Sequence, residues 1–236
     1  IGSLQALVEL ARGLPEVAEQ QIKRAIAASD ESLELELLRV NMLGNQGRTK
    51  EAMNFANAAC EHHPRSPPPW MVLSTMHRAA ENNLESQSGI QRGLKAVGPT
   101  DRQGMARSLA VLELLQGDRK KGLKRLSGLT EQDPRDVITR SLMLSLPEVI
   151  QDTKLGERLL ADIRRVRGEN STLWRRHRAR LWLGSDQWRT QRAEVIEGLE
   201  QWRFHDPANS LPTLTLAGVY LRLGEAKQAE RVCRQA

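Results

Sequence analysis

Residues 216–229 read LAGVYLRLGEAKQA, and the spacing of apolar, small and turn residues in this stretch predicts how the chain folds. Apolar residues recur at helical intervals up to Gly224, and a short polar link then leads to Ala229, five positions further on. Glycine ends a helix readily because it accepts a left-handed backbone without steric cost. A small residue early in the next helix lets two helices approach closely, so the stretch predicts an antiparallel helix pair.

The same layout occurs twice more upstream. Gly47 is followed five residues later by Ala52, and Gly117 is followed at the same interval by Gly122. In both copies a proline stands 12 residues after the small residue. Shared internal spacing of this kind indicates a repeated helical hairpin.

A period of about 35 residues organises the chain. Pro64, Pro99 and Pro134 are 35 residues apart, and proline favours the junction between units because it cannot continue a helix. A single array over residues 1–236 is expected, with junctions near residues 30, 64, 99, 134, 169 and 207. Turns within the units are expected near Gly47, Asn82, Gly117, Gly184 and Gly224.

The composition agrees with an all-α fold. Leu and Ala supply most of the 39% hydrophobic content, aromatic residues make up only 3%, and strand-forming runs are missing. Each predicted helix is too short to be stable alone in water, so neighbouring pairs must stack into a solenoid. No apolar stretch approaches the ~18 residues that a membrane-spanning helix needs.

These units resemble tetratricopeptide repeats. The matching positions are Leu216–Ala217, Tyr220, Gly224, Ala229 and Ala236 in the last unit, Gly47, Ala52, Ala59 and Pro64 in an early one, and Leu109–Ala110, Gly117 and Pro134 in a central one. The resemblance implies a right-handed superhelix of about seven helix pairs. One unit departs from the pattern, with Asn82 and Gln87 where Gly and Ala are expected. Residues 137–207 are irregular, and Pro147 is expected to shorten a first helix there.

In the tetratricopeptide family the first helix of each pair lines a concave groove that holds a partner. Counting from the turn markers places five residues toward that groove: Asn41, Arg78, Arg107, Trp174 and Arg178. The resemblance implies a protein or peptide partner, and the arginines favour an acidic one. Family members that grip chaperone C-termini use a Lys/Asn/Arg clamp, of which only Asn41 is matched here, so that partner is not supported.

No catalytic or metal-binding motif accompanies the repeats. A nucleophile elbow, a phosphate-binding glycine loop and a metalloprotease helix are all missing from the sequence. His62 and His63 precede Pro64 at a helix end, where imidazoles can meet exposed carbonyl groups, and no further metal ligands follow at suitable spacing. Cys60 and Cys233 are expected to be buried, reduced thiols. The expectation is a non-catalytic scaffold without cofactor or metal.

The formal charge of +6 leaves two alternatives open. Basic residues concentrate at 119–125, 158–167 and 175–180, where an anionic polymer could bind. Pentatricopeptide repeats are also about 35 residues long and read RNA. Prolines and small residues here follow the tetratricopeptide layout instead, which disfavours nucleic acid. An accessory repeat arm of a bacterial exopolysaccharide assembly or secretion system, in contact with anionic polysaccharide or an enzyme, is the other alternative.

Tryptophans mark the irregular region. Trp182, Trp188 and Trp202 are expected to fill the core, while Trp174 is the candidate anchor for a partner.

The two ends of the chain carry their own expectations. The last unit stops before a capping helix, so we expect a piece of a longer array that leaves Leu216, Tyr220 and Val232 partly uncovered and self-associates there. The first residues include neither a start Met nor a targeting segment, which leaves the compartment open between cytoplasm and bacterial periplasm.

Overall fold

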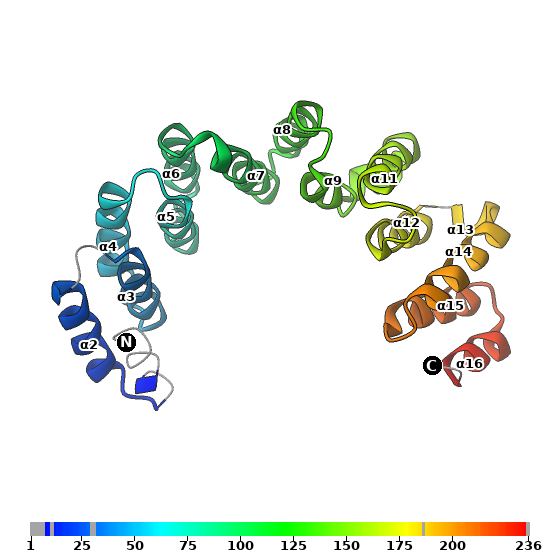
Figure 1. The fold of residues 1–236 in the computed structure, drawn as a ribbon, viewed down its shortest axis with the longest axis horizontal. Helices are drawn as coiled ribbons and strands as arrows, with labels where there is room; N and C mark the ends of the chain where they lie inside the picture. Colours follow the sequence, from blue (N-terminus) through cyan, green and yellow to red (C-terminus); the bar gives the residue numbers. More distant parts are fainter. Residues whose placement is uncertain (1–7, 10–11, 29–31, 186, 235–236) are drawn as a thin grey trace. The chain divides into compact units, whose positions relative to one another are not determined.

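The computed structural model describes residues 8–9, 12–28, 32–185 and 187–234, and within these ranges it contains helices and no β-strand (Figure 1). Two compact units divide the chain, residues 1–125 (unit 1) and residues 126–236 (unit 2). The helices of unit 1 are α2 (Pro15–Ala28), α3 (Leu33–Asn45), α4 (Thr49–His62), α5 (Pro67–Ala79), α6 (Asn83–Ala96) and α7 (Pro99–Leu115). Helix α8 (Arg119–Gln132) crosses the boundary.

Unit 2 contains the more irregular helices. They are α9 (Val137–Met143), α10 (Pro147–Gln151), α11 (Thr153–Arg167), α12 (Thr172–Gly184), α13 (Gln187–Thr190), α14 (Arg192–His205), α15 (Ser210–Arg222) and α16 (Ala226–Arg234).

Within each unit the chain runs back and forth as helix pairs. In unit 1, α3 packs against α4 and α5 against α6, and in unit 2, α12 packs against α14 and α15 against α16. Six such pairs follow α2 in the described part of the chain, in agreement with an array of about seven repeats. The all-α stack of helix pairs is therefore confirmed, while the hand of the superhelix stays a prediction.

The tight turns fall where the glycines predict them. Gly47, Gly117 and Gly224 have φ angles of 75°, 90° and 77°, in the left-handed region. The small residues after these turns are buried: Ala52 is 0% and Ala229 is 4% exposed. These positions have no room for a larger side chain because the two helices of each pair approach one another there.

One turn was misplaced by one residue. The left-handed residue between α5 and α6 is Glu81, with φ 61°, and Asn82 is the N-cap of α6. The small residue five positions after Glu81 is Ser86, which is fully buried and lies 2.8 Å from the Ser74 hydroxyl. This unit therefore keeps the layout of the others. The turn of this unit is not marked by a glycine in the sequence, because Glu81 adopts the left-handed conformation.

The irregularity expected between residues 137 and 207 is also present. Helix α9 ends at Met143, and Pro147 begins the separate short helix α10, because proline has no N–H to continue a helix. Gly168, with φ 83°, follows α11 near the expected junction. The junction expected near residue 30 lies outside the described residues.

Each unit has an apolar core between its helices. In unit 1 it includes Ile22, Leu43, Leu73 and Ile90. In unit 2, Trp182 and Trp202 are buried as expected, and Trp188 packs against the same cluster while half-buried.

Two expectations about burial are wrong. Leu216, Tyr220 and Val232 are 0%, 8% and 1% exposed, because they belong to the core that α15 and α16 share with α14. Cys60 is buried, and burial raises the pKa of its thiol to about 12, but Cys233 is exposed on α16. The polar side of the short helix α16 carries this second cysteine.

Candidate functional site

Four first helices share one pattern of exposure. Helices α3, α5, α12 and α15 each contain 13 residues. In each, the second, fifth, ninth and twelfth residues are exposed or half-buried. We call these positions the groove face. They are Glu34, Leu37, Asn41 and Gly44 in α3, Pro68, Met71, Thr75 and Arg78 in α5, Leu173, Arg176, Arg180 and Leu183 in α12, and Leu211, Leu214, Gly218 and Leu221 in α15.

The spacing explains why these positions form a face. Residues three, four and three positions apart lie above one another on one side of an α-helix. First helices run in the same direction because the chain reverses twice in each repeat. They also contact one another within each unit, α3 with α5, α5 with α7, and α12 with α15. Equal positions on neighbouring first helices therefore point to the same side.

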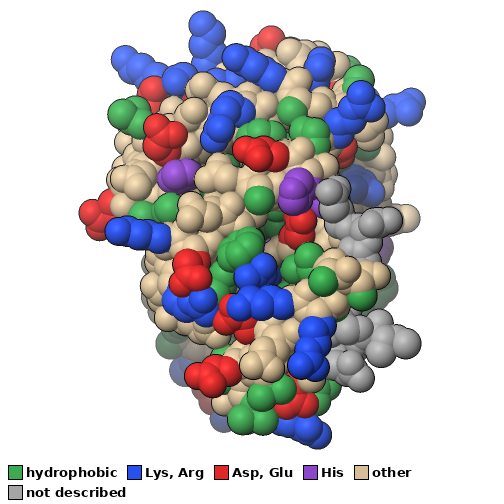
Figure 2. Space-filling view, turned by 90° about the vertical axis from the view of Figure 1, so that its left-hand side faces the viewer, with side chains coloured by type: hydrophobic (Ala, Val, Ile, Leu, Met, Phe, Trp, Pro, Cys, Tyr) green, Lys and Arg blue, Asp and Glu red, His purple; other side chains and the backbone are tan. Residues whose placement is uncertain are grey.

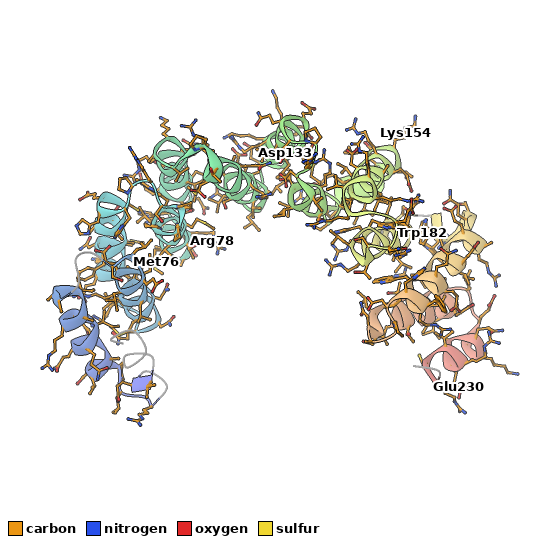
Figure 3. The ribbon with its side chains drawn as sticks, in the orientation of Figure 1. Met76, Arg78, Asp133, Lys154, Trp182 and Glu230 are labelled. Atoms are coloured by element: carbon orange, nitrogen blue, oxygen red, sulfur yellow. The ribbon has the colours of Figure 1, made fainter. Side chains whose placement is uncertain are left out.

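In unit 1 the structure brings three of the sequence-predicted residues to this face. Asn41 is the ninth residue of α3 and Arg78 the twelfth of α5, and both are exposed. Figure 3 shows Arg78 near the end of α5. Arg107, counted back from the end of the longer helix α7, takes the position equivalent to the fifth residue of α5 and is half-buried.

The other two predicted residues lie on a different side of α12. Trp174 and Arg178 are its third and seventh residues, equivalent to Pro212 and Leu216, which are buried in α15. Both line one hollow of 270 Å³ with residues of α14 and a second hollow of 430 Å³ with residues of α11. The structure thus places this pair together, against the second helices of unit 2, and not on the groove face.

The groove face of α12 is formed by residues that sequence reasoning did not select. Arg176 and Arg180 are exposed, and neither has an ion pair among the described residues. Ser171, whose hydroxyl accepts a hydrogen bond from the Leu173 N–H at 3.3 Å, is the N-cap of this helix. Counting from that cap, and not from Gly184, would have identified both arginines.

Beside these arginines α15 presents an apolar strip. Leu211, Leu214 and Leu221 are 40%, 60% and 61% exposed. Gly218 stands between them, and a Cβ added there would meet no atom within 4 Å. The equivalent residues of α5 are also exposed, although α5 has a first helix on either side. Stacking a neighbour against a first helix therefore does not cover this face.

Some charges near the surface are locally compensated. Figure 2 shows acidic and basic side chains interspersed over the face that it presents. Arg48, for example, lies 2.7 Å from a Glu19 carboxylate oxygen and 2.6 Å from one of Glu51. Arg176 and Arg180 have no such pairing among the described residues, and Arg158 and Arg167 of α11 share this property, so what distinguishes the α12 arginines is the leucine strip beside them.

Three further observations bear on other classes of site. His62 Nδ1 lies 2.8 Å from Glu36 Oε1, so a carboxylate meets this imidazole. The described residues hold no group of three or more His, Cys, Asp or Glu side chains arranged to bind a metal ion. Within the same residues, no helix has the length and apolar character needed to cross a bilayer.

Comparison with known proteins places the fold. Neither a protein-family model nor a curated protein matches the chain. A tetratricopeptide repeat protein from Parabacteroides merdae matches with a TM-score of 0.60 and 18% identity, over 86% of this chain and 78% of that one. Yeast Tom70 matches with a TM-score of 0.66 and 12% identity, over 99% of this chain and 48% of its own length. At these identities the likeness shows the fold alone.

The class defined by the fold is the helical-repeat solenoids. Within that class, the chain has the tetratricopeptide-like repeat that its turn and small-residue spacing predicts.

Proposed function

We propose that the chain is a non-catalytic scaffold whose groove face binds an amphipathic, acidic segment of a partner protein. The observation that carries the proposal is the leucine strip of α15 beside two unpaired arginines of α12. On unit 1, the proposed partner contacts are Asn41, Arg78 and Arg107, which lie on the groove face of that unit.

The exposed leucines of α15 and the arginines of α12 together favour a partner segment that is both apolar and acidic. Burying a fully exposed leucine contributes roughly 1.5–3 kcal/mol. Leu211, Leu214 and Leu221 are 40–61% exposed, so covering each contributes about 1 kcal/mol. Carboxylates placed beside the apolar residues of the partner would pair with Arg176 and Arg180. A helix with apolar residues three to four positions apart and acidic flanks meets both requirements.

A synthetic peptide tests this proposal. The probe is an amphipathic peptide of about 15 residues, with leucine along one face and glutamate on its flanks, and the comparison peptide carries lysine in place of glutamate. We expect the glutamate peptide to bind and to weaken with added salt, and the lysine peptide not to bind. The double variant Arg176→Glu/Arg180→Glu should lower the affinity at least about tenfold, and Leu214→Glu should do the same.

The matched control reverses two charges elsewhere in unit 2. Arg158→Glu/Arg167→Glu alters two exposed arginines of α11 and should leave the affinity unchanged. Equal weakening by both double variants would mean that only net charge matters, and the proposed site would be lost. An anionic polysaccharide or an RNA oligomer that bound more tightly than the peptide, with no dependence on Leu214, would favour the polymer-binding alternative instead.

A further inference from the structure

A second face of α12 holds an arginine that has no ion pair among the described residues. Arg175 is 8% exposed, and within the described part of the chain its one side-chain hydrogen bond runs from Nη1 to the Ser171 carbonyl oxygen at 3.4 Å. No carboxylate of the described residues lies within 4.0 Å of its guanidinium. Burial, the largest influence, lowers the pKa of Arg175, although the nearby Glu169 acts in the opposite direction.

Two other arginines of unit 2 with low exposure pair with carboxylates. Arg140 donates to the carbonyl oxygens of Thr130, Asp133 and Asp136 and lies 3.2 Å from Asp162. Arg178 lies 2.8 Å from Glu157. Arg175 differs from both because no carboxylate pairs with it, and none of its nitrogens is fully buried without a partner, so its unused N–H groups reach the solvent.

Arg175 lines the 270 Å³ hollow between α12 and α14. Arg164 and Arg175 stack on the Trp174 ring, with guanidinium carbons 5.2 Å and 5.0 Å from the ring centroid. Stacking engages the flat side of a guanidinium and leaves the N–H groups at its edge available to an acceptor. Arg164 already pairs with Glu169 at 2.6 Å, so Arg175 supplies the available donors.

Neighbouring residues set the size and shape of the hollow. Trp182 forms part of the wall on the side of α12 that faces α14, as Figure 3 shows. Gly198 of α14 makes room for this ring, since a Cβ there would lie 2.5 Å from Trp182 Cη2. A volume of 270 Å³ is below the range of about 300–1,000 Å³ typical of drug-sized ligands. It suits one side chain or chain end.

We propose that this hollow is a second binding site, which takes a single carboxylate of a partner peptide onto the guanidinium of Arg175. Glu194 and Glu197 line the same hollow from α14, and their repulsion of an anion increases with the charge of that anion. The site therefore favours one carboxylate over phosphate, nucleic acid or a polyanion. It is separate from the groove face because Arg175 is the fourth residue of α12, next to Arg176 on the other side of the helix.

Three short peptides test the assignment and identify the source of the carboxylate. One is an acetylated, amidated tetrapeptide with a single glutamate; the second carries glutamine instead; the third carries glutamine and a free C-terminus. Binding is followed through the indole N–H resonances in ¹H–¹⁵N spectra, with Trp174 assigned from Trp174→Phe. We expect a carboxylate peptide to shift the Trp174 and Trp182 resonances, with a Kd on the order of 1 mM or tighter, and the neutral peptide to shift neither.

Arg175→Met separates a binding role from a structural one. Methionine keeps much of the length and removes the charge, so carboxylate binding should fall at least about tenfold while the melting temperature stays level or rises. Arg176→Met, one residue away on the groove face, should leave this binding unchanged. A lower melting temperature for Arg175→Met alone would make Arg175 a structural residue and overturn the proposal.

Other results would overturn it as well. No shift with any carboxylate peptide at about 10 mM, or inorganic phosphate bound as tightly as the peptides, contradicts a single-carboxylate site. The groove-face proposal is tested independently, since Arg176→Glu/Arg180→Glu removes the groove contacts and should leave the hollow functional.

Discussion

The buried His177 should make the stability of unit 2 depend on pH. This side chain is 4% exposed, and neither ring nitrogen has a hydrogen-bond partner among the residues that the structure describes. Burial, and to a lesser extent the charges of Arg176 and Arg180, lower its pKa from 6.5 to about 4. Protonation is therefore much easier in the unfolded chain than in the folded one.

The sign and size of the effect follow from that difference. Above pH 6.5 the imidazole is neutral in both states and protonation costs no stability. As the pH falls from 6.5 toward 4, the unfolded chain gains a proton that the folded chain resists, so the free energy of unfolding declines. A shift from 6.5 to about 4 corresponds to a loss of about 3 kcal/mol, complete near pH 4.

Urea denaturation of wild type and His177→Met between pH 7.5 and pH 4 measures this loss. The variant places an apolar side chain in the core that cannot titrate. Other titratable groups contribute equally to the pH dependence of both proteins. We expect the stability of wild type relative to the variant to fall by about 3 kcal/mol across this range. The control His205→Met lies at an exposed site and should follow wild type at every pH. A difference between wild type and His177→Met that stays constant with pH would refute the reasoning.

Three further predictions concern the stability of unit 1. Gly93→Ala should destabilise unit 1 by about 1–3 kcal/mol, because the added Cβ would lie 2.8 Å from Trp70 Cβ. At Gly89, on the same helix, an added Cβ would meet no described atom closer than 4.0 Å, so Gly89→Ala should leave the melting temperature unchanged or raise it. Glu81→Gly should stabilise by about 1 kcal/mol, since it relieves a left-handed residue with φ 61°; an unchanged urea midpoint would contradict this. Glu113→Ala should cost about 3 kcal/mol, because it removes a fully buried carboxylate 2.8 Å from an Arg125 nitrogen, and Glu113→Gln should lose less in the same denaturation assay.

The repeat architecture could be predicted because its signals are local and in phase. A left-handed glycine and a small residue five positions later are steric requirements of a tight helix pair, so Gly47 with Ala52 and Gly224 with Ala229 reveal it directly. The signal failed at Glu81, where the backbone adopts the same turn without glycine. Such a turn can be recognised only from neighbouring structure.

The register of α12 could not be predicted for a related reason. Gly184 looks like a turn marker, but it ends the helix under the side chain of Ile150, where a Cβ would collide. Glycine is required there for packing, and it is the last residue of α12, whereas Gly47 and Gly224 lie two residues after the ends of α3 and α15. Counting from Gly184 shifts the assignment by two residues, which brings Trp174 and Arg178 onto the groove in place of Arg176 and Arg180.

The arginines of α12 are close together in the sequence but lie on different faces of the helix. In the sequence, Arg175, Arg176, Arg178 and Arg180 form one basic cluster, which suggests a single patch for an anionic polymer. A helix turns by about 100° per residue, so the cluster divides between two faces. Arg176 and Arg180 lie in the open beside the leucines of α15, and Arg175 and Arg178 lie among indole rings and glutamates against α11 and α14. Because desolvation and neighbouring charges differ between the two faces, we propose different ligands for the same residue type: an amphipathic acidic segment on one face and a single carboxylate on the other.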